Sequence, residues 1–239
     1  MRAMNTNILA FGAHPDDVEF GCGGVIARET AAGRTATIVI GSRGEAATHG
    51  SPRARAREAK RGAACLGAKL EFVKLGGDAH FEVTVAGALR LAAIIRRLRP
   101  SLILAPTVVD TQHPDHAALG RLVRQAARLA RYGGVRELRR QPAHAIDVLL
   151  HYAITVEAEP RDAQPIFCDV SAPAVMAAWQ AAMRAHATQA ATRRYTELQL
   201  ARAFVNGQRC SLEAAIALWP AEPLVFDSLA AVTRSARRF

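Results

Sequence analysis

The sequence predicts a Rossmann-like three-layer α/β/α fold with a mostly parallel sheet and a C-terminal capping portion. Short apolar runs alternate with helical patterns up to residue 131, which is typical of a doubly wound parallel sheet. The 239 residues, 50% of them hydrophobic, are enough for one large domain with a buried core. No linker or repeat divides the sequence. We therefore predict a single domain over residues 1–239, with a core over 1–131 and a capping portion over 132–239.

Four strands are expected in the core, and all of these runs except the more polar one over 69–74 consist mostly of apolar or β-branched residues. They cover residues 7–12, 35–40, 69–74 and 101–105. The helices between them are bounded by capping and stop residues, with Ser51 as an N-cap and with Gly33, Gly67 and Pro100 as stops. These helices are predicted over residues 21–32, 53–66, 84–99 and 116–131.

Beyond residue 131 the regular alternation ends. Two further strands are predicted over residues 146–154 and 166–170, and two helices over 172–191 and 195–205. We expect this part to cap the site that the core forms.

Composition excludes several classes of protein. The net charge is +10, but the arginines are scattered and lack the interleaved aromatic residues that stack on bases, so we expect no nucleic-acid partner. The four cysteines form no CxxC pair, which argues against a cysteine metal site. The apolar runs are too short to span a membrane, and residues 1–7 do not resemble a signal peptide. A cytoplasmic protein without a membrane partner is expected.

Two short clusters rich in His and Asp are the main functional signal. Residues 13–17 read Ala-His-Pro-Asp-Asp, and residues 113–116 read His-Pro-Asp-His. Each cluster follows a predicted strand. Because ligands of open α/β sheets bind at the carboxyl ends of the strands, we expect the two clusters to meet there.

The clusters contain the residue types of a hydrolytic zinc site. One His from each cluster together with Asp17 would form a His2Asp ligand set with an open position for water. Asp16 is adjacent and is the candidate acceptor of the proton of that water. The remaining His is expected to donate a proton or to stabilise an oxyanion, with Asp115 orienting it.

Two other classes of function explain the sequence less well. A basic nucleic-acid-binding domain would leave both clusters without a role. A dinucleotide-binding enzyme would need a glycine fingerprint where residues 11–14 read Phe-Gly-Ala-His.

The chain resembles the PIG-L/LmbE-like family of zinc-dependent N-acetylglucosaminide de-N-acetylases over nearly its whole length. The residues that carry the resemblance read NILAFGAHPDDVEFGCGG, SRGE, RAREA, LRPSLILAP and IFCDVSAP. Within the family it looks similar to the bacterial branch that includes the bacillithiol-pathway deacetylase. The resemblance implies a Rossmann-like sheet, an amino-sugar substrate and a homo-oligomer such as a hexamer.

The resemblance also implies residue roles. The implied zinc ligands are His14, Asp17 and His116, although other divalent transition metals bind such sites as well. The implied catalytic residues are Asp16 as general base, His113 as the charge-stabilising residue or acid, and Asp115 as the partner of His113. The implied substrate contacts are Arg55 and Tyr195.

Two departures from the family concern specificity. Gln112 stands where bacillithiol-type enzymes have an arginine that binds an anionic aglycone, and residues 212–220 replace a family segment. We therefore predict removal of acetyl from an N-acetylglucosamine-type sugar or its conjugate. The alternative is an amidase acting on a thiol conjugate, or a deacylase of a secondary metabolite, with the same metal site.

Overall fold

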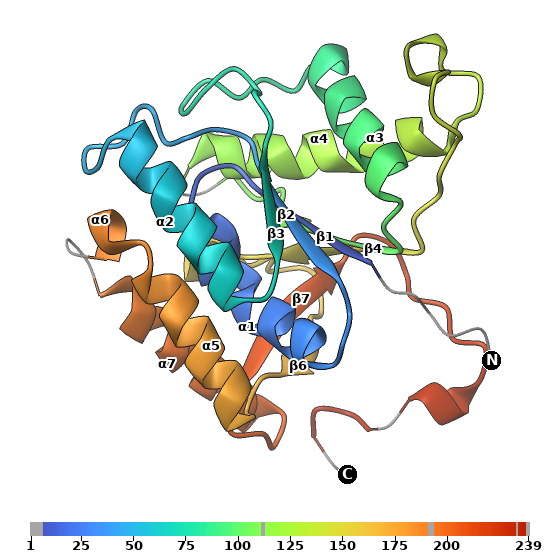
Figure 1. Cartoon of the computed structure of the whole chain (residues 1–239). Coiled ribbons are helices and arrows are strands. Elements are labelled where there is room, and N and C mark those ends of the chain that lie inside the picture. Colours follow the sequence, from blue (N-terminus) through green and yellow to red (C-terminus); the bar gives the residue numbers. More distant parts are fainter. Residues whose placement is uncertain (1–6, 111–112, 191–193, 233, 238–239) are drawn as a thin grey trace.

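One seven-stranded sheet organises the part of the chain that the computed structural model describes, residues 7–110, 113–190, 194–232 and 234–237 (Figure 1). The strands are β1 (Ile8–Gly12), β2 (Ala36–Ile40), β3 (Lys69–Phe72), β4 (Leu102–Pro106), β5 (Val148–Tyr152), β6 (Ile166–Asp169) and β7 (Ala215–Pro220). Their order across the sheet is β3-β2-β1-β4-β5-β7-β6. Strands β1 to β5 pair in parallel, whereas β7 is antiparallel to both β5 and β6. The predicted mostly parallel sheet is confirmed.

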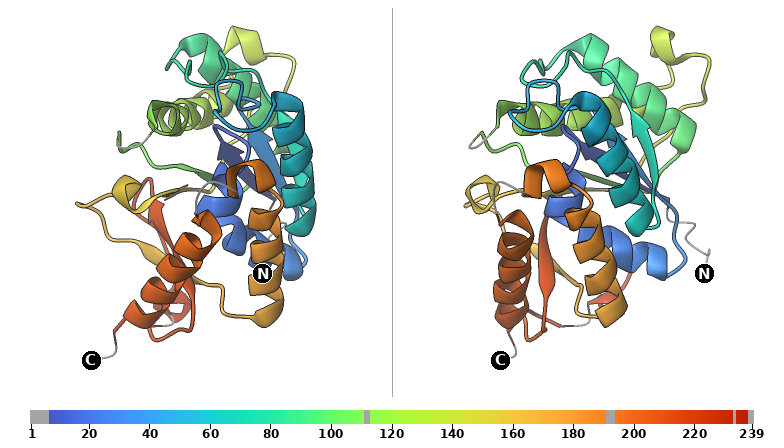
Figure 2. Two further views of the ribbon diagram at one scale, coloured as in Figure 1. Left: turned by 90° about the vertical axis from the view of Figure 1, so that its left-hand side faces the viewer. Right: turned by 60° about the vertical axis from the view of Figure 1, so that its left-hand side comes forward.

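Helices cover both faces of the sheet, which gives the three predicted layers (Figure 2). They are α1 (Asp17–Ala31), α2 (Pro52–Cys65), α3 (Val85–Leu98), α4 (Pro114–Arg131), α5 (Pro173–Arg184), α6 (Ala187–Ala190) and α7 (Tyr195–Arg209), with 3-10 turns at Arg136–Leu138, Val156–Ala158 and Leu229–Ala231. Helices α3 and α4 pack together on one face, and α1, α2, α5 and α7 pack on the other. Both faces are thus covered, and every residue of β1 and β2 is buried; all of these residues except Thr37 are apolar or glycine. No helix in the described ranges is long and apolar enough to cross a membrane.

Strand β1 lies at the centre of the fold. It pairs with β2 on one side and with β4 on the other, with Leu9 opposite both Thr37 and Ile103. The chain first moves outward from β1 to β2 and β3 and then returns to β4. The boundary between β1 and β4 is therefore the topological switch point, where ligands of such sheets bind.

Two helices begin two or more residues earlier than predicted, and both beginnings lie next to this switch point. Helix α1 starts at Asp17 rather than at residue 21, and α4 starts at Pro114 rather than at residue 116. Pro114 suits the first helical position because the proline lacks an N–H group that would be unpaired there. His113 caps α4, with its side chain accepting from the Asp115 N–H. Each cluster therefore includes the first turn of a helix.

The C-terminal third differs from the prediction in two elements. The predicted helix over 172–191 is divided into α5 and α6. No strand was predicted at β7, which is buried over five of its six residues and lies between β5 and β6. The predicted capping portion thus adds three strands to the same sheet, while its separation from the core at residue 131 stays a prediction.

Candidate metal centre

The two His/Asp clusters meet at the switch point, as the sequence predicts. The first follows β1 and the second follows β4, and the two strands are neighbours in the sheet. The ring centres of His14 and His116 are 5.2 Å apart, and those of His14 and His113 are 4.5 Å apart. Residues separated by about a hundred positions in sequence are thus brought into one group by the pairing of β1 with β4.

Asp17 is held rigidly at the start of α1. Its side chain is 3% exposed, and its Oδ2 accepts hydrogen bonds from the backbone N–H groups of Ala13 (2.7 Å) and His14 (2.9 Å). The remaining oxygen, Oδ1, lies 3.2 Å from His116 Nε2. Despite burial, the two neighbouring imidazoles hold the pKa of Asp17 well below its usual range. Asp17 therefore presents an ionised carboxylate to the two histidines, with Oδ1 near His116 and Oδ2 near His14.

His14, Asp17 and His116 fit a divalent metal ion. His14 Nδ1 lies 3.3 Å from His116 Nε2 and 3.6 Å from Asp17 Oδ2. Ligand atoms about 2.0–2.1 Å from a tetrahedral zinc ion are about 3.3 Å from one another. Two imidazoles and one carboxylate at this spacing are the donor types that zinc and related metals prefer.

Two further carboxylates bind the opposite side of the His14 ring. His14 Nε2 lies 3.0 Å from Asp78 Oδ1 and 3.2 Å from Asp115 Oδ2. A proton on Nε2 leaves the Nδ1 lone pair directed at His116 and Asp17, which is how carboxylates orient metal-binding imidazoles. Asp78 and Asp115 thus position His14.

The structure gives Asp115 a different partner from the one predicted. Its carboxylate accepts from the N–H groups of Ala79 (2.7 Å) and Phe81 (3.3 Å) and contacts His14, whereas only its backbone N–H meets His113. The reason is geometric. In the first turn of α4 the Asp115 side chain turns toward the loop after β3, away from the capping histidine.

His113 lies at the mouth of the site, with its side chain 34% exposed. Burial, with His14 and His116 nearby, lowers the pKa of His113, which favours the neutral ring. Its Nδ1 accepts from the Asp115 N–H, so the ring proton of the neutral form is on Nε2. Nε2 is 3.8 Å from Asp78 Oδ1, and both residues line the cavity that is described below. Neutral His113 can thus donate a hydrogen bond from Nε2 to a ligand in that cavity.

Asp16 is held in an unusual backbone conformation, with φ of 112° and ψ of −26°. Non-glycine residues rarely adopt positive φ, and such strain concentrates at functional sites. The buried Arg55 stabilises this conformation by donating to the Pro15 carbonyl (2.8 Å) and to Asp16 Oδ2 (3.3 Å). Burial raises the pKa of Asp16 to about 6, and the negative charge of Asp17 adds to the rise while Arg55 opposes it. Asp16 therefore titrates near neutrality.

A cavity of about 350 Å³ opens over these residues. Its walls include the metal-ligand candidates, Asp16, Asp78, Arg55 and, from α7, Tyr195. The Tyr195 ring packs against Phe20 with 5.5 Å between ring centres. Gln112, the other predicted substrate contact, lies outside the described residues.

Three further polar residues line the cavity and were not predicted as site residues from the sequence: Asp78, Gln189 and Gln199. Asp78 follows β3 after Gly76 and Gly77, so the rule that locates sites at strand ends applies to it as well. The two glutamines belong to α6 and α7, and no local pattern distinguishes them from surface residues.

Comparison with known proteins places this geometry in context. The sequence model of the PIG-L family, described as GlcNAc-PI de-N-acetylase, matches residues 9–127. The chain is 31% identical over 132 residues to the diacetylchitobiose deacetylase of Thermococcus kodakarensis, which covers 52% of this chain and 49% of that protein. It is also 31% identical over 148 residues to the 4-oxalmesaconate hydratase of Pseudomonas putida, which covers 56% of this chain and 57% of that protein. The chain thus spans about half the length of the curated relatives it matches.

The fold has a similar counterpart among solved structures. A conserved protein of Thermus thermophilus superimposes with a TM-score of 0.81 at 28% identity, covering 92% of this chain and 96% of that one. The relatives include both deacetylases and a hydratase, so the family match alone leaves the reaction to be decided by the site.

Proposed function

Because the chain carries a PIG-L family domain, we propose that it is a zinc-dependent hydrolase that removes acetyl from an N-acetylglucosamine-type amino sugar or its conjugate. One observation carries the proposal. Ligand atoms of His14, Asp17 and His116 lie close enough together to share one metal ion, and they border the same cavity as Asp16, a carboxylate whose pKa burial raises to about 6. A metal ligand set beside a general base is what hydrolysis of an amide requires.

The residues of the site have complementary roles in this proposal. A divalent ion bound by the three ligands would polarise the amide carbonyl and lower the pKa of a coordinated water to about 7. Asp16 accepts the proton of the attacking water, and Arg55 keeps its carboxylate in position. Neutral His113 donates a hydrogen bond from Nε2–H to the oxygen of the tetrahedral intermediate. Protonated Asp16 then transfers its proton to the amine nitrogen as the C–N bond breaks, and acetate and the free amine are released.

The hydratase relative suggests a second candidate, which is addition of water to a carboxylate-bearing substrate. The charges of the cavity favour the deacetylase. Among its described lining residues Arg55 is the one Lys or Arg, and that guanidinium already binds Asp16 and lies 3.9 Å from Asp78. The divalent ion of the proposal and the Arg55 guanidinium would together balance the carboxylates of Asp16, Asp17 and Asp78, so no other Lys or Arg of the described lining is left to pair with the carboxylates of a polyanion. An uncharged sugar enters such a cavity at a lower electrostatic cost than a polyanion does.

The test is release of free amine by zinc-loaded protein from N-acetylglucosamine, diacetylchitobiose, the malate glycoside of N-acetylglucosamine and a thiol conjugate. Release from one sugar substrate, reduced about a hundredfold or more by Asp16→Asn, is the expected result. Asp110→Asn is the matched control, because Asp110 is an exposed carboxylate outside the cavity.

Failure has a defined meaning in this assay. If metal-loaded protein releases amine from none of the sugars, the deacetylase proposal is wrong. Cleavage of the thiol conjugate alone would instead establish the amidase alternative.

A further inference from the structure

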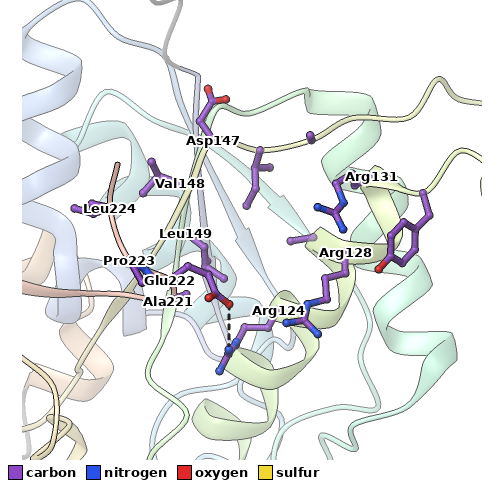
Figure 3. A pocket seen from close by; sticks show the side chains of 14 residues that line it. Arg124, Arg128, Arg131, Asp147, Val148, Leu149, Ala221, Glu222, Pro223 and Leu224 are labelled. Atoms are coloured by element: carbon purple, nitrogen blue, oxygen red, sulfur yellow. Dashed lines mark ion pairs between the residues drawn. The ribbon is translucent and has the colours of Figure 1, made fainter. Parts of the chain in front are cut away.

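A second cavity, of about 410 Å³, lies beside α4 and shares no lining residue with the cavity of the metal centre. It is bordered by the C-terminal half of α4, by the residues that lead into β5, and by residues 221–224 after β7 (Figure 3). Its size is in the range of cavities that bind small molecules. The metal centre lies at the other end of α4, at His116.

Three arginines of α4 line this second cavity. Arg124, Arg128 and Arg131 are four and three positions apart, so they share one face of the helix. In the described part of the chain, neither Arg128 nor Arg131 has a carboxylate oxygen within 4.0 Å. Arg124 has one such partner at 3.7 Å, Glu222, whose side chain is 72% exposed. Exposed pairs of this kind are weak. The Arg131 guanidinium lies over the Tyr132 ring, 5.3 Å from its centre, and a contact with the face of the guanidinium leaves the N–H groups at its edge available to a ligand.

The cavity also has an apolar side. Ile146, Val148, Leu149 and Leu224 line it together with the arginines. The position of arginines near the end of a helix is explained by the helix dipole, but the dipole does not explain why they border a cavity with apolar side chains. A cavity with arginines on one side and apolar side chains on the other suits a ligand that has both a negatively charged group and an apolar part.

We propose that this cavity binds a small anionic molecule in which a phosphate group is attached to an apolar or planar body. Guanidinium groups bind phosphate oxygens through paired, charge-assisted hydrogen bonds, and the aliphatic side chains would contact the body of the ligand. Asp147 also lines the cavity, but its carboxylate points away from the three arginines in Figure 3. Glu222 would exchange its contact with Arg124 for solvent.

The experiment is calorimetric titration of the metal-loaded chain, residues 1–239, with four probes. ADP carries a planar body and octyl phosphate an aliphatic one, whereas pyrophosphate has charge alone and adenosine has a body alone. We expect ADP or octyl phosphate to bind at least about tenfold more tightly than both pyrophosphate and adenosine. The preferred probe of the first two identifies the kind of body. Absence of binding by both at millimolar concentration, or equal binding of pyrophosphate, would overturn the proposal.

Charge-reversal variants separate this cavity from general attraction to a basic protein. Arg128→Glu should weaken binding of the preferred probe about tenfold or more. Arg139→Glu makes the same charge change at an exposed position outside the cavity and should leave the affinity within about twofold. Equal weakening by both variants would show that net charge, rather than this cavity, attracts the probe. Neither arginine lines the cavity of the metal centre, so the result does not depend on the deacetylase proposal.

Discussion

Replacing Asp115 with Asn tests whether this buried carboxylate positions His14. Its Oδ2 accepts from the Ala79 N–H and contacts His14 Nε2, and its Oδ1 accepts from the Phe81 N–H. Asn has one acceptor oxygen where Asp has two, so at least one buried N–H group would face an amide donor. An unpaired buried donor costs about 1–3 kcal/mol, and loss of a negative charge in the first turn of α4 costs about 0.3–1 kcal/mol.

We therefore expect Asp115→Asn to lower the free energy of unfolding of the metal-free protein by about 2 kcal/mol, measured by urea denaturation. Zinc affinity, measured by competition with a chelator, should fall about 10- to 100-fold because His14 is no longer oriented. Asp110→Asn is the control for stability. That side chain is 60% exposed and pairs with the 43% exposed Arg121, so weakening this exposed ion pair should cost less than about 1 kcal/mol.

His113→Ala distinguishes the two candidate partners of Asp115. If Asp115 acts through His14, the His113 variant should keep zinc affinity within about threefold of wild type while losing activity. The reasoning is refuted if Asp115→Asn retains wild-type zinc affinity and unfolds like the Asp110 variant.

Three further predictions concern the cavity of the metal centre. The rate of amide hydrolysis should rise with pH through about 6, because burial raises the pKa of Asp16 to about 6 and only its ionised form accepts a proton; a flat rate profile between about pH 5 and 8 would argue against Asp16 as the base. His14→Ala should abolish stoichiometric zinc, measured by elemental analysis, and full retention of zinc would contradict the ligand set. Gly44→Ala should lower kcat about a hundredfold with zinc retained, because Gly44 has a φ of +72° and an added Cβ would collide with the Arg55 guanidinium. Gly134→Ala, whose Cβ would meet no atom within 4 Å, should keep wild-type kcat, and equal kcat in both glycine variants would refute that role of Gly44.

The sequence alone was sufficient for the general architecture and for locating the site. Strands β1, β2 and β4 were predicted from short, mostly apolar runs that polar or turn residues bound, and β3, a more polar and partly exposed strand, was predicted as well. The meeting of the two clusters followed from a general property of parallel sheets, namely that strands of one direction end at one edge. Both signals are local in sequence, and both are confirmed by the pairing of β1 with β4.

The sequence alone did not determine the position of β7 or the extent of the first turns of α1 and α4. The six residues of β7 read AIALWP, an apolar run that periodicity cannot assign to strand or helix. It becomes a strand because β5 and β6 present hydrogen-bonding edges on either side of it. Helices α1 and α4 begin earlier than predicted because the side chains of Asp17 and His113 accept hydrogen bonds from backbone N–H groups there. The sequence pattern did not indicate these hydrogen bonds.

Only the tertiary structure decided which groups surround each catalytic candidate. Sequence proximity suggested His113 as the partner of Asp115, whereas folding places Asp115 and Asp78 on the far nitrogen of His14. Likewise, Arg55 reaches Asp16 from α2 because Gly44 leaves space for its guanidinium. Residue types and their spacing therefore predicted the candidate metal ligands His14, Asp17 and His116. The partners of each side chain depended on distances between segments that are remote in sequence, and only the packing of the folded chain sets those distances.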